Sequence, residues 1–208
     1  MNRPKCAQDF NARFGRILVK YFGGDPSPIE DDWCWKEFAE AYPHLRKKAE
    51  KYFETAITGD PAWAAYNMVY DCGSQPSWAE GVIENADIGN PAHSAYAMVF
   101  DCDSSREWAE GVIERAKIRN PAHNAYNMVR DCGSDREWAE GVIERSEVGN
   151  PAYAAHCMAH ECGSSREWAE GVIERAQTGD PAQSAQCMVF CCGSSREWAE
   201  EIKRKHAE

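Results

Sequence analysis

The chain has 208 residues, of which 43% are hydrophobic, and it carries a formal net charge of −11. This length and composition exclude a disordered chain and allow one or two globular domains. Residues 1–60 contain ten basic and ten acidic side chains, whereas residues 61–208 contain thirteen basic and twenty-four acidic ones. This acidic excess disfavours direct binding to nucleic acid or an anionic membrane and favours a protein partner with a basic surface.

The amino-terminal part of the sequence is expected to be helical. One helix is predicted at about 5–22, and residues 31–60 align with the later repeats through Ala49-Glu50, which indicates a degenerate repeat. Residues 1–60 are therefore interpreted as an amino-terminal helical cap. Charges interrupt the first 22 residues, which disfavours a signal peptide, and no segment is apolar enough to span a membrane. We expect a cytoplasmic protein.

From residue 61 onward a 30-residue motif occurs five times, beginning at Pro61, Pro91, Pro121, Pro151 and Pro181. Asp or Asn precedes each proline, which predicts a helix with an Asx N-cap and Pro at its first position. A Cys followed by Gly or Asp is expected to end this first helix about twelve residues later. A Ser-x-x-Glu capping box, such as Ser104 to Glu107, predicts a second helix.

One such helix pair cannot bury its apolar side alone, so the copies are expected to stack. The fold prediction is all-α: a right-handed αα-solenoid of five 30-residue helix-turn-helix repeats in one continuous domain, with helical caps at both ends. In the last copy Glu201, Ile202 and Lys203 replace Gly-Val-Ile, which indicates the carboxy-terminal cap.

The predicted core of each repeat consists of two apolar stripes. In the second copy these are Ala95, Met98, Cys102, Trp108, Val112 and Ala116. The repeated cysteines are expected to be reduced and buried, because equivalent residues on stacked helices lie about 8–10 Å apart, too far for a disulfide. Gly111 and its equivalents lie mid-helix and are expected to admit a neighbouring tryptophan.

Residues 58–208 resemble short HEAT-like repeats, through the Asx-Pro helix start and the first helix rich in small residues; the phycobilisome-lyase type is nearest in repeat length. The pairing of Ala95-Tyr96 with Trp108-Ala109-Glu110 is also similar to helical repeats in phage and bacterial proteins of unknown role. The resemblance implies an α-solenoid that serves as a binding surface, and it assigns no functional residue.

Three positions of the first helix, spaced i, i+3 and i+7, vary strongly among the copies and share one face. They hold mainly aromatic residues, His and Arg, which dominate binding hot spots. We predict that another protein binds there. The predicted binding residues are Trp63, Tyr66, Tyr70, His93, Tyr96, Phe100, His123, Tyr126, Arg130, Tyr153, His156 and His160. The alternative is that these side chains only fill the space between repeats.

Three acidic positions per copy, held by Asp101, Glu110 and Glu114 in the second copy, suggest an alternative function. Stacked copies would place them in rows of carboxylates about 10 Å apart. Such rows could imitate nucleic acid, as in a phage-encoded, anti-CRISPR-like inhibitor of a nucleic-acid-binding protein. The arginines of the same copies favour instead a solvated surface of balanced charge.

A metal-binding protein or small enzyme is a weaker alternative, based on two residue pairs in the last two copies. His156 and His160 are i, i+4, as are Cys187 and Cys191, and two His with two Cys could bind zinc. The two pairs are about 100° out of phase around the helix, which disfavours the site. We expect no metal, no cofactor and no catalytic residue, and a monomer.

Overall fold

The computed structural model describes residues 43–56 and 59–206, and within them the regular elements are α-helices. The helix expected at about 5–22 and residues 31–42 of the degenerate repeat lie outside the described residues. The chain divides into two compact units, residues 1–94 and 95–208. None of the described helices is long and apolar enough to cross a membrane.

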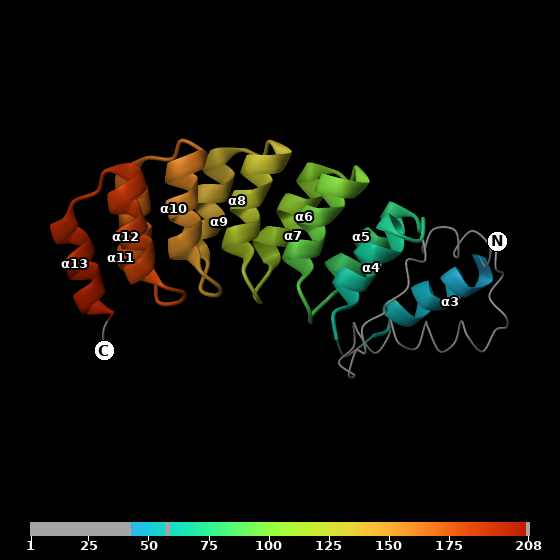
Figure 1. Ribbon diagram of the computed structural model, residues 1–208. Coiled ribbons are helices and arrows are strands. Elements are labelled where there is room, and N and C mark those ends of the chain that lie inside the picture. The colour runs from blue at the N-terminus through green and yellow to red at the C-terminus, as the bar shows by residue number, and fades with distance from the viewer. Residues whose placement is uncertain (1–42, 57–58, 207–208) are drawn as a thin grey trace, which may run out of the picture. The chain divides into compact units, whose positions relative to one another are not determined.

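Helices alternate in pairs with a period of 30 residues (Figure 1). The first helices of the five repeats are α4 (Pro61–Tyr70), α6 (Pro91–Cys102), α8 (Pro121–Cys132), α10 (Pro151–Glu161) and α12 (Pro181–Cys192). The second helices are α5 (Pro76–Glu84), α7 (Arg106–Arg115), α9 (Arg136–Arg145), α11 (Arg166–Arg175) and α13 (Arg196–Lys205). Helix α3 (Pro43–Phe53) precedes them.

The pairs stack in chain order within each unit. In residues 95–208, α8 packs on α10 and α10 on α12, while α9 lies against α8 and α10, and α11 against α10 and α12. Figure 1 shows these pairs side by side. In the amino-terminal unit α4 packs on α3 and on α5. The predicted all-α, solenoid-like helical repeat is confirmed.

The first helices begin as the Asx-Pro motif predicts. The side chain of Asp60 accepts a hydrogen bond from the Trp63 N–H (3.0 Å), and that of Asn120 accepts one from the His123 N–H (3.2 Å). Each bond satisfies a backbone donor that the first turn of a helix leaves unpaired. The proline at the first position has no such donor to lose.

The second helices begin one residue later than the capping box predicts. The Trp108 N–H donates to the Ser105 hydroxyl (3.2 Å), so Ser105 and not Ser104 is the N-cap. The N–H of Ser104 donates instead to the Met98 carbonyl (3.1 Å), which makes Ser104 part of the end of the preceding helix. The same shift places the later N-caps at Asp135, Ser165 and Ser195.

The core lies between the two layers of helices. It contains fully buried Met and Ile side chains at repeating positions: Met98, Ile113, Met128, Ile143, Met158, Ile173 and Met188. The stripe tryptophans are only half-buried, and the indoles of Trp168 and Trp198 reach the second helix of the preceding repeat. The repeated cysteines are also half-buried rather than buried; the cysteines of the described segments are thiols.

The mid-helix glycines do not receive a tryptophan, so that expectation was wrong. A Cβ atom built on Gly81 would meet no atom within 4 Å. At Gly111, Gly141 and Gly171 the nearest atom is an arginine Nη1 four residues later, at 3.1–3.2 Å. The backbone here faces open space or a flexible guanidinium.

Candidate functional site

The predicted binding face separates into a buried column and an exposed column. The buried column includes Tyr66, Tyr126 and His156, which are 7%, 2% and 9% exposed. Four residues later in each first helix, the side chain is exposed in every repeat: Tyr70, Phe100, Arg130, His160 and Phe190. In the carboxy-terminal unit we call Phe100, Arg130, His160 and Phe190 the exposed row.

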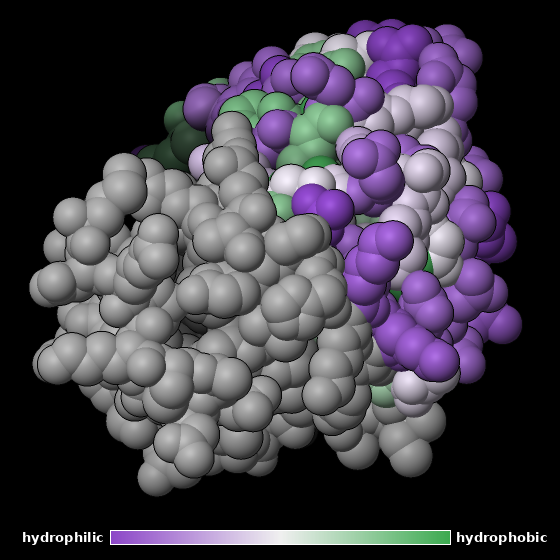
Figure 2. All heavy atoms as spheres, turned by 90° about the vertical axis from the view of Figure 1, so that its right-hand side faces the viewer, coloured by the Kyte–Doolittle hydropathy of each residue, from purple (hydrophilic) through white to green (hydrophobic). Residues whose placement is uncertain are grey.

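Exposed large hydrophobic side chains gather on the first helices. Among the residues that the structure describes, they are Tyr70 and Phe100 (57% each), Tyr153 (44%) and Phe190 (75%). In Figure 2 the visible described residues are mostly hydrophilic, with smaller hydrophobic areas among them. Sequence reasoning left Phe190 out of the binding residues, although it shares the position of Phe100.

The first of the three predicted positions, which Trp63 holds in the first repeat, forms ring contacts between repeats. Trp63 stacks on His93 with ring centroids 5.1 Å apart in the amino-terminal unit. His123 meets Tyr153 at 5.9 Å in the carboxy-terminal unit. Trp63, His93 and His123 are half-buried, so these rings contribute to both packing and surface.

Half-buried Tyr96 and buried Tyr126, at the same position of consecutive repeats, join those repeats to the next by hydrogen bonds. The Tyr96 hydroxyl donates to Asp131 (2.8 Å) and the Tyr126 hydroxyl to Glu161 (2.5 Å), in each case 35 residues further on. Burial and the bond to Asp131 raise the pKa of Tyr96 to about 12. These tyrosines therefore hold the repeats together as well as filling space.

Arg130 is fixed in place on the exposed row. Its Nε and Nη2 donate to the two carboxylate oxygens of Asp131 (2.8 and 2.6 Å), and its Nη1 donates to the Tyr126 hydroxyl (2.9 Å). These bonds lower the pKa of Asp131, chiefly through Arg130. The guanidinium carbon lies 5.0 Å from the centre of the Tyr126 ring. The row thus presents a preorganised planar cation.

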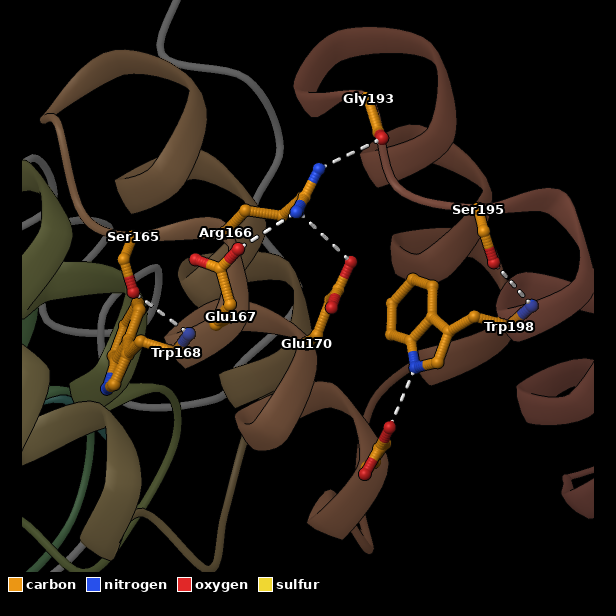
Figure 3. Close-up of polar contacts among 9 residues, drawn as sticks. Ser165, Arg166, Glu167, Trp168, Glu170, Gly193, Ser195 and Trp198 are labelled. Carbon is orange, nitrogen blue, oxygen red and sulfur yellow. Dashed lines mark hydrogen bonds and ion pairs between the residues drawn. The ribbon is translucent and has the colours of Figure 1, made fainter.

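The charged side chains of the second helices connect each repeat to the next. Arg136 Nη1 donates to the carbonyl of Gly163 (2.8 Å), and its Nε lies 3.6 Å from Glu140. Figure 3 shows the same arrangement one repeat later, where Arg166 reaches Gly193 and lies beside Glu170. Glu140 and Glu170 are therefore already paired with an arginine of their own helix.

A second acidic position accepts bonds from tryptophan. The Trp168 and Trp198 Nε1–H groups donate to Glu144 and Glu174, both at 2.8 Å. Trp138 differs, because its Nε1 is buried without a hydrogen-bond partner. The carboxylate one repeat before it, Glu114, lies instead 3.8 Å from Arg145.

Open grooves separate the carboxy-terminal ends of consecutive second helices. The groove between α7 and α9 has a volume of about 740 Å³, and the one between α9 and α11 about 390 Å³. Apolar residues such as Val142 and charged residues such as Lys117 and Arg145 line the larger groove. This mixed lining contains no exposed aromatic side chain comparable to Phe190.

The proposed zinc ligands are not gathered into one site. In residues 43–56 and 59–206, no three His, Cys, Asp or Glu side chains are grouped so that they could hold a metal ion. His156 and His160 stack with ring centroids 6.0 Å apart, and Cys191 is exposed to solvent. Burial lowers the pKa of His156, helped by the neighbouring His160.

Comparison with protein-family models, with curated proteins and with solved structures finds no match to this chain. The fold is that of an αα-repeat, and its exposed aromatic side chains lie on the first helices.

Proposed function

We propose that the chain is a non-catalytic helical-repeat scaffold that binds another protein through the exposed row of its carboxy-terminal unit. The observation that carries this proposal is the position of the exposed large hydrophobic side chains, all of which, among the described residues, lie on first helices. Aromatic residues and arginine supply most of the energy at protein interfaces, and a fixed Arg130 loses little entropy on binding.

The contacts that the acidic side chains make within the protein favour this function over imitation of nucleic acid. All three acidic positions already have partners: Asp131 and Glu144 accept hydrogen bonds from Tyr96 and Trp168 of a neighbouring repeat, and Glu170 pairs with Arg166 of its own helix. A carboxylate that is already paired attracts a basic partner less than an unpaired one does. The resemblance to HEAT-like repeats, which mostly serve as binding surfaces, adds support.

The test is capture of partners from a lysate of the organism that encodes the chain, with quantitative mass spectrometry. Three baits are compared: the unaltered chain, Phe100→Ala with Phe190→Ala, and Glu107→Gln with Glu167→Gln. The last pair is the matched control, because both carboxylates are exposed on second helices (75% and 70%). Equal denaturant midpoints would establish that all three baits are folded.

We expect a protein that the unaltered chain and the glutamine control enrich and that the double alanine variant loses at least tenfold. Its retention should change little between low and moderate salt, since apolar contacts are not screened. A partner that resists the alanine substitutions and is released by moderate salt would instead favour the acidic inhibitor.

A further inference from the structure

The exposed row places one side chain of each first helix at the same position of consecutive repeats. Phe100 is 57% exposed and Phe190 75%, and the side chains of Arg130 and His160 between them are 42% and 47% exposed. Phe100 and His160 each stack on the ring four residues earlier in their own helix, with centroids 5.8 and 6.0 Å apart. The row therefore consists of four separate contact points.

The spacing of these contact points follows from the packing of the first helices. Helix α8 packs on α10 and α10 on α12, and the Tyr96 hydroxyl joins α6 to α8 through Asp131. The first helices run in the same direction, because a second helix returns the chain between each two of them (Figure 1). Equivalent residues on parallel helices in contact lie about 8–10 Å apart. A partner that follows the row must therefore present a side chain on one face about every 8–10 Å.

The regular backbone conformations differ in whether they meet this spacing. A polyproline II helix has three residues per turn and rises about 3.1 Å per residue, so every third side chain lies on one face, about 9.3 Å further on. A β-strand returns a side chain to one face about every 6.6 Å. An α-helix needs seven residues, about 10.5 Å, and places another side chain about halfway between. Polyproline II is the conformation that fits the row.

Arg130 adds hydrogen-bond donors between the two phenylalanines of the row. Its bonds to Asp131 and Tyr126 use three of the five guanidinium N–H groups and leave one on each terminal nitrogen. A polyproline II segment makes no internal backbone hydrogen bonds, so its carbonyl oxygens can accept from such donors. Proline has no backbone N–H that would need an acceptor in return. The fixed donors of Arg130 therefore suit a proline-rich chain.

The carboxylates beside the row indicate the charge of the segment. Asp101, Asp131 and Glu161 each follow a member of the row directly in the sequence. The Glu161 side chain is 41% exposed, and residues 61–208 contain twenty-four acidic and thirteen basic side chains. Lys or Arg residues next to the apolar residues of the segment are attracted to such a surface.

We propose that the exposed row binds a basic, proline-rich segment in the polyproline II conformation, with a large apolar side chain at every third residue. The apolar residues contact Phe100 and Phe190, and carbonyl oxygens between them accept hydrogen bonds from Arg130. A preformed polyproline II helix loses little conformational entropy when it docks on aromatic side chains. This inference rests on the proposed function and specifies the form of its partner.

The experiment titrates the full chain into fluorescein-labelled peptides and follows fluorescence anisotropy. The first peptide has four Pro-Pro-Leu triplets between terminal lysines. The second contains the same residues with the leucines at alternate positions, which keeps the charge and removes the three-residue period. The third is an amphipathic helical peptide with leucines on one face and the same charge.

We expect the first peptide to bind with a Kd at least tenfold lower than that of either other peptide. Phe100→Ala with Phe190→Ala should weaken its binding at least tenfold, because both apolar contacts are lost. The matched control, Glu107→Gln with Glu167→Gln, should change the Kd less than about twofold, since both carboxylates lie on second helices.

Equal affinities for the first two peptides would overturn the inference, because the row would not distinguish the three-residue period. Tighter binding of the helical peptide, or binding of the first peptide that survives the alanine substitutions, would also overturn it. If no peptide binds while the lysate capture still loses its partner with the double alanine variant, the inference fails and the proposed function stands. If no peptide binds and the capture yields no such partner, both fail.

Discussion

First and second helices follow different rules of variation. The sequence REWAEGVIER is identical in α7, α9 and α11, whereas the first helices differ at their outward positions. The structure explains the contrast, because Arg166, Trp168 and Glu170 of α11 all take part in polar contacts (Figure 3). The side chains of Phe100 and Phe190 are apolar and make no such polar contacts. The second helices are constant where these contacts are made, whereas the first helices vary both at the exposed row and at the position of Tyr126 and His156.

The largest expected effect is the loss of stability when a buried side chain is truncated. It tests whether first and second helices, which differ at the surface, share one core. Ile143 in α9 and Met128 in α8 are both fully buried. Ile143→Ala and Met128→Ala should each lower the free energy of unfolding by about 2–5 kcal/mol, through lost burial and the cavity left behind. Urea unfolding measures both. A cost confined to one helix would mean that the two layers do not share one core.

A smaller effect separates two tryptophans at the same position of different repeats. Trp168→Phe removes the bond to Glu144 and should cost about 1–2 kcal/mol. Trp138→Phe removes an indole N–H that is buried without a partner, so it should be neutral or slightly stabilising. Denaturant midpoints of the two variants should therefore differ. Equal costs would show that the indole bond contributes nothing to joining the repeats.

The smallest effect concerns Gly81, a second-helix position where an added side-chain atom meets no neighbour. Gly81→Ala should stabilise the protein by about 0.5–1 kcal/mol, because Ala favours a helix and the added Cβ meets no atom. Gly149→Ala is the contrasting control. Its φ of +79° and the Asn120 oxygen 2.5 Å from the added Cβ predict a loss of stability. Thermal melts of both variants measure these effects, and destabilisation by Gly81→Ala would contradict the open space beside its backbone.

Much of the fold follows from local sequence signals. The Asx-Pro pairs place the first helices because a cap and its proline act within four residues. The capping box fails by one residue since the backbone of Ser104 is already committed to Met98, a requirement of the preceding helix. The period predicts stacking, and stacking buries Met and Ile from both layers.

The division of the candidate face was harder to predict. Tyr126 and Arg130 are both variable and lie on one side of α8, yet Tyr126 is buried and Arg130 exposed. The difference depends on the next repeat, whose Glu161 accepts the tyrosine hydroxyl. An offset of 35 residues between partners is a property of the packing between repeats, and no local pattern contains it.

The central claim is that side chains of the second helices join the repeats, whereas Phe100, His160 and Phe190 of the exposed row contribute little to stability. The most direct test is the unfolding free energy, in urea, of single alanine variants in two matched sets. Arg136, Trp168 and Glu174 form one set, and Phe100, His160 and Phe190 the other. The account predicts a cost of about 1 kcal/mol or more for each member of the first set and changes within about 0.5 kcal/mol for the second. Equal mean costs in the two sets would contradict it.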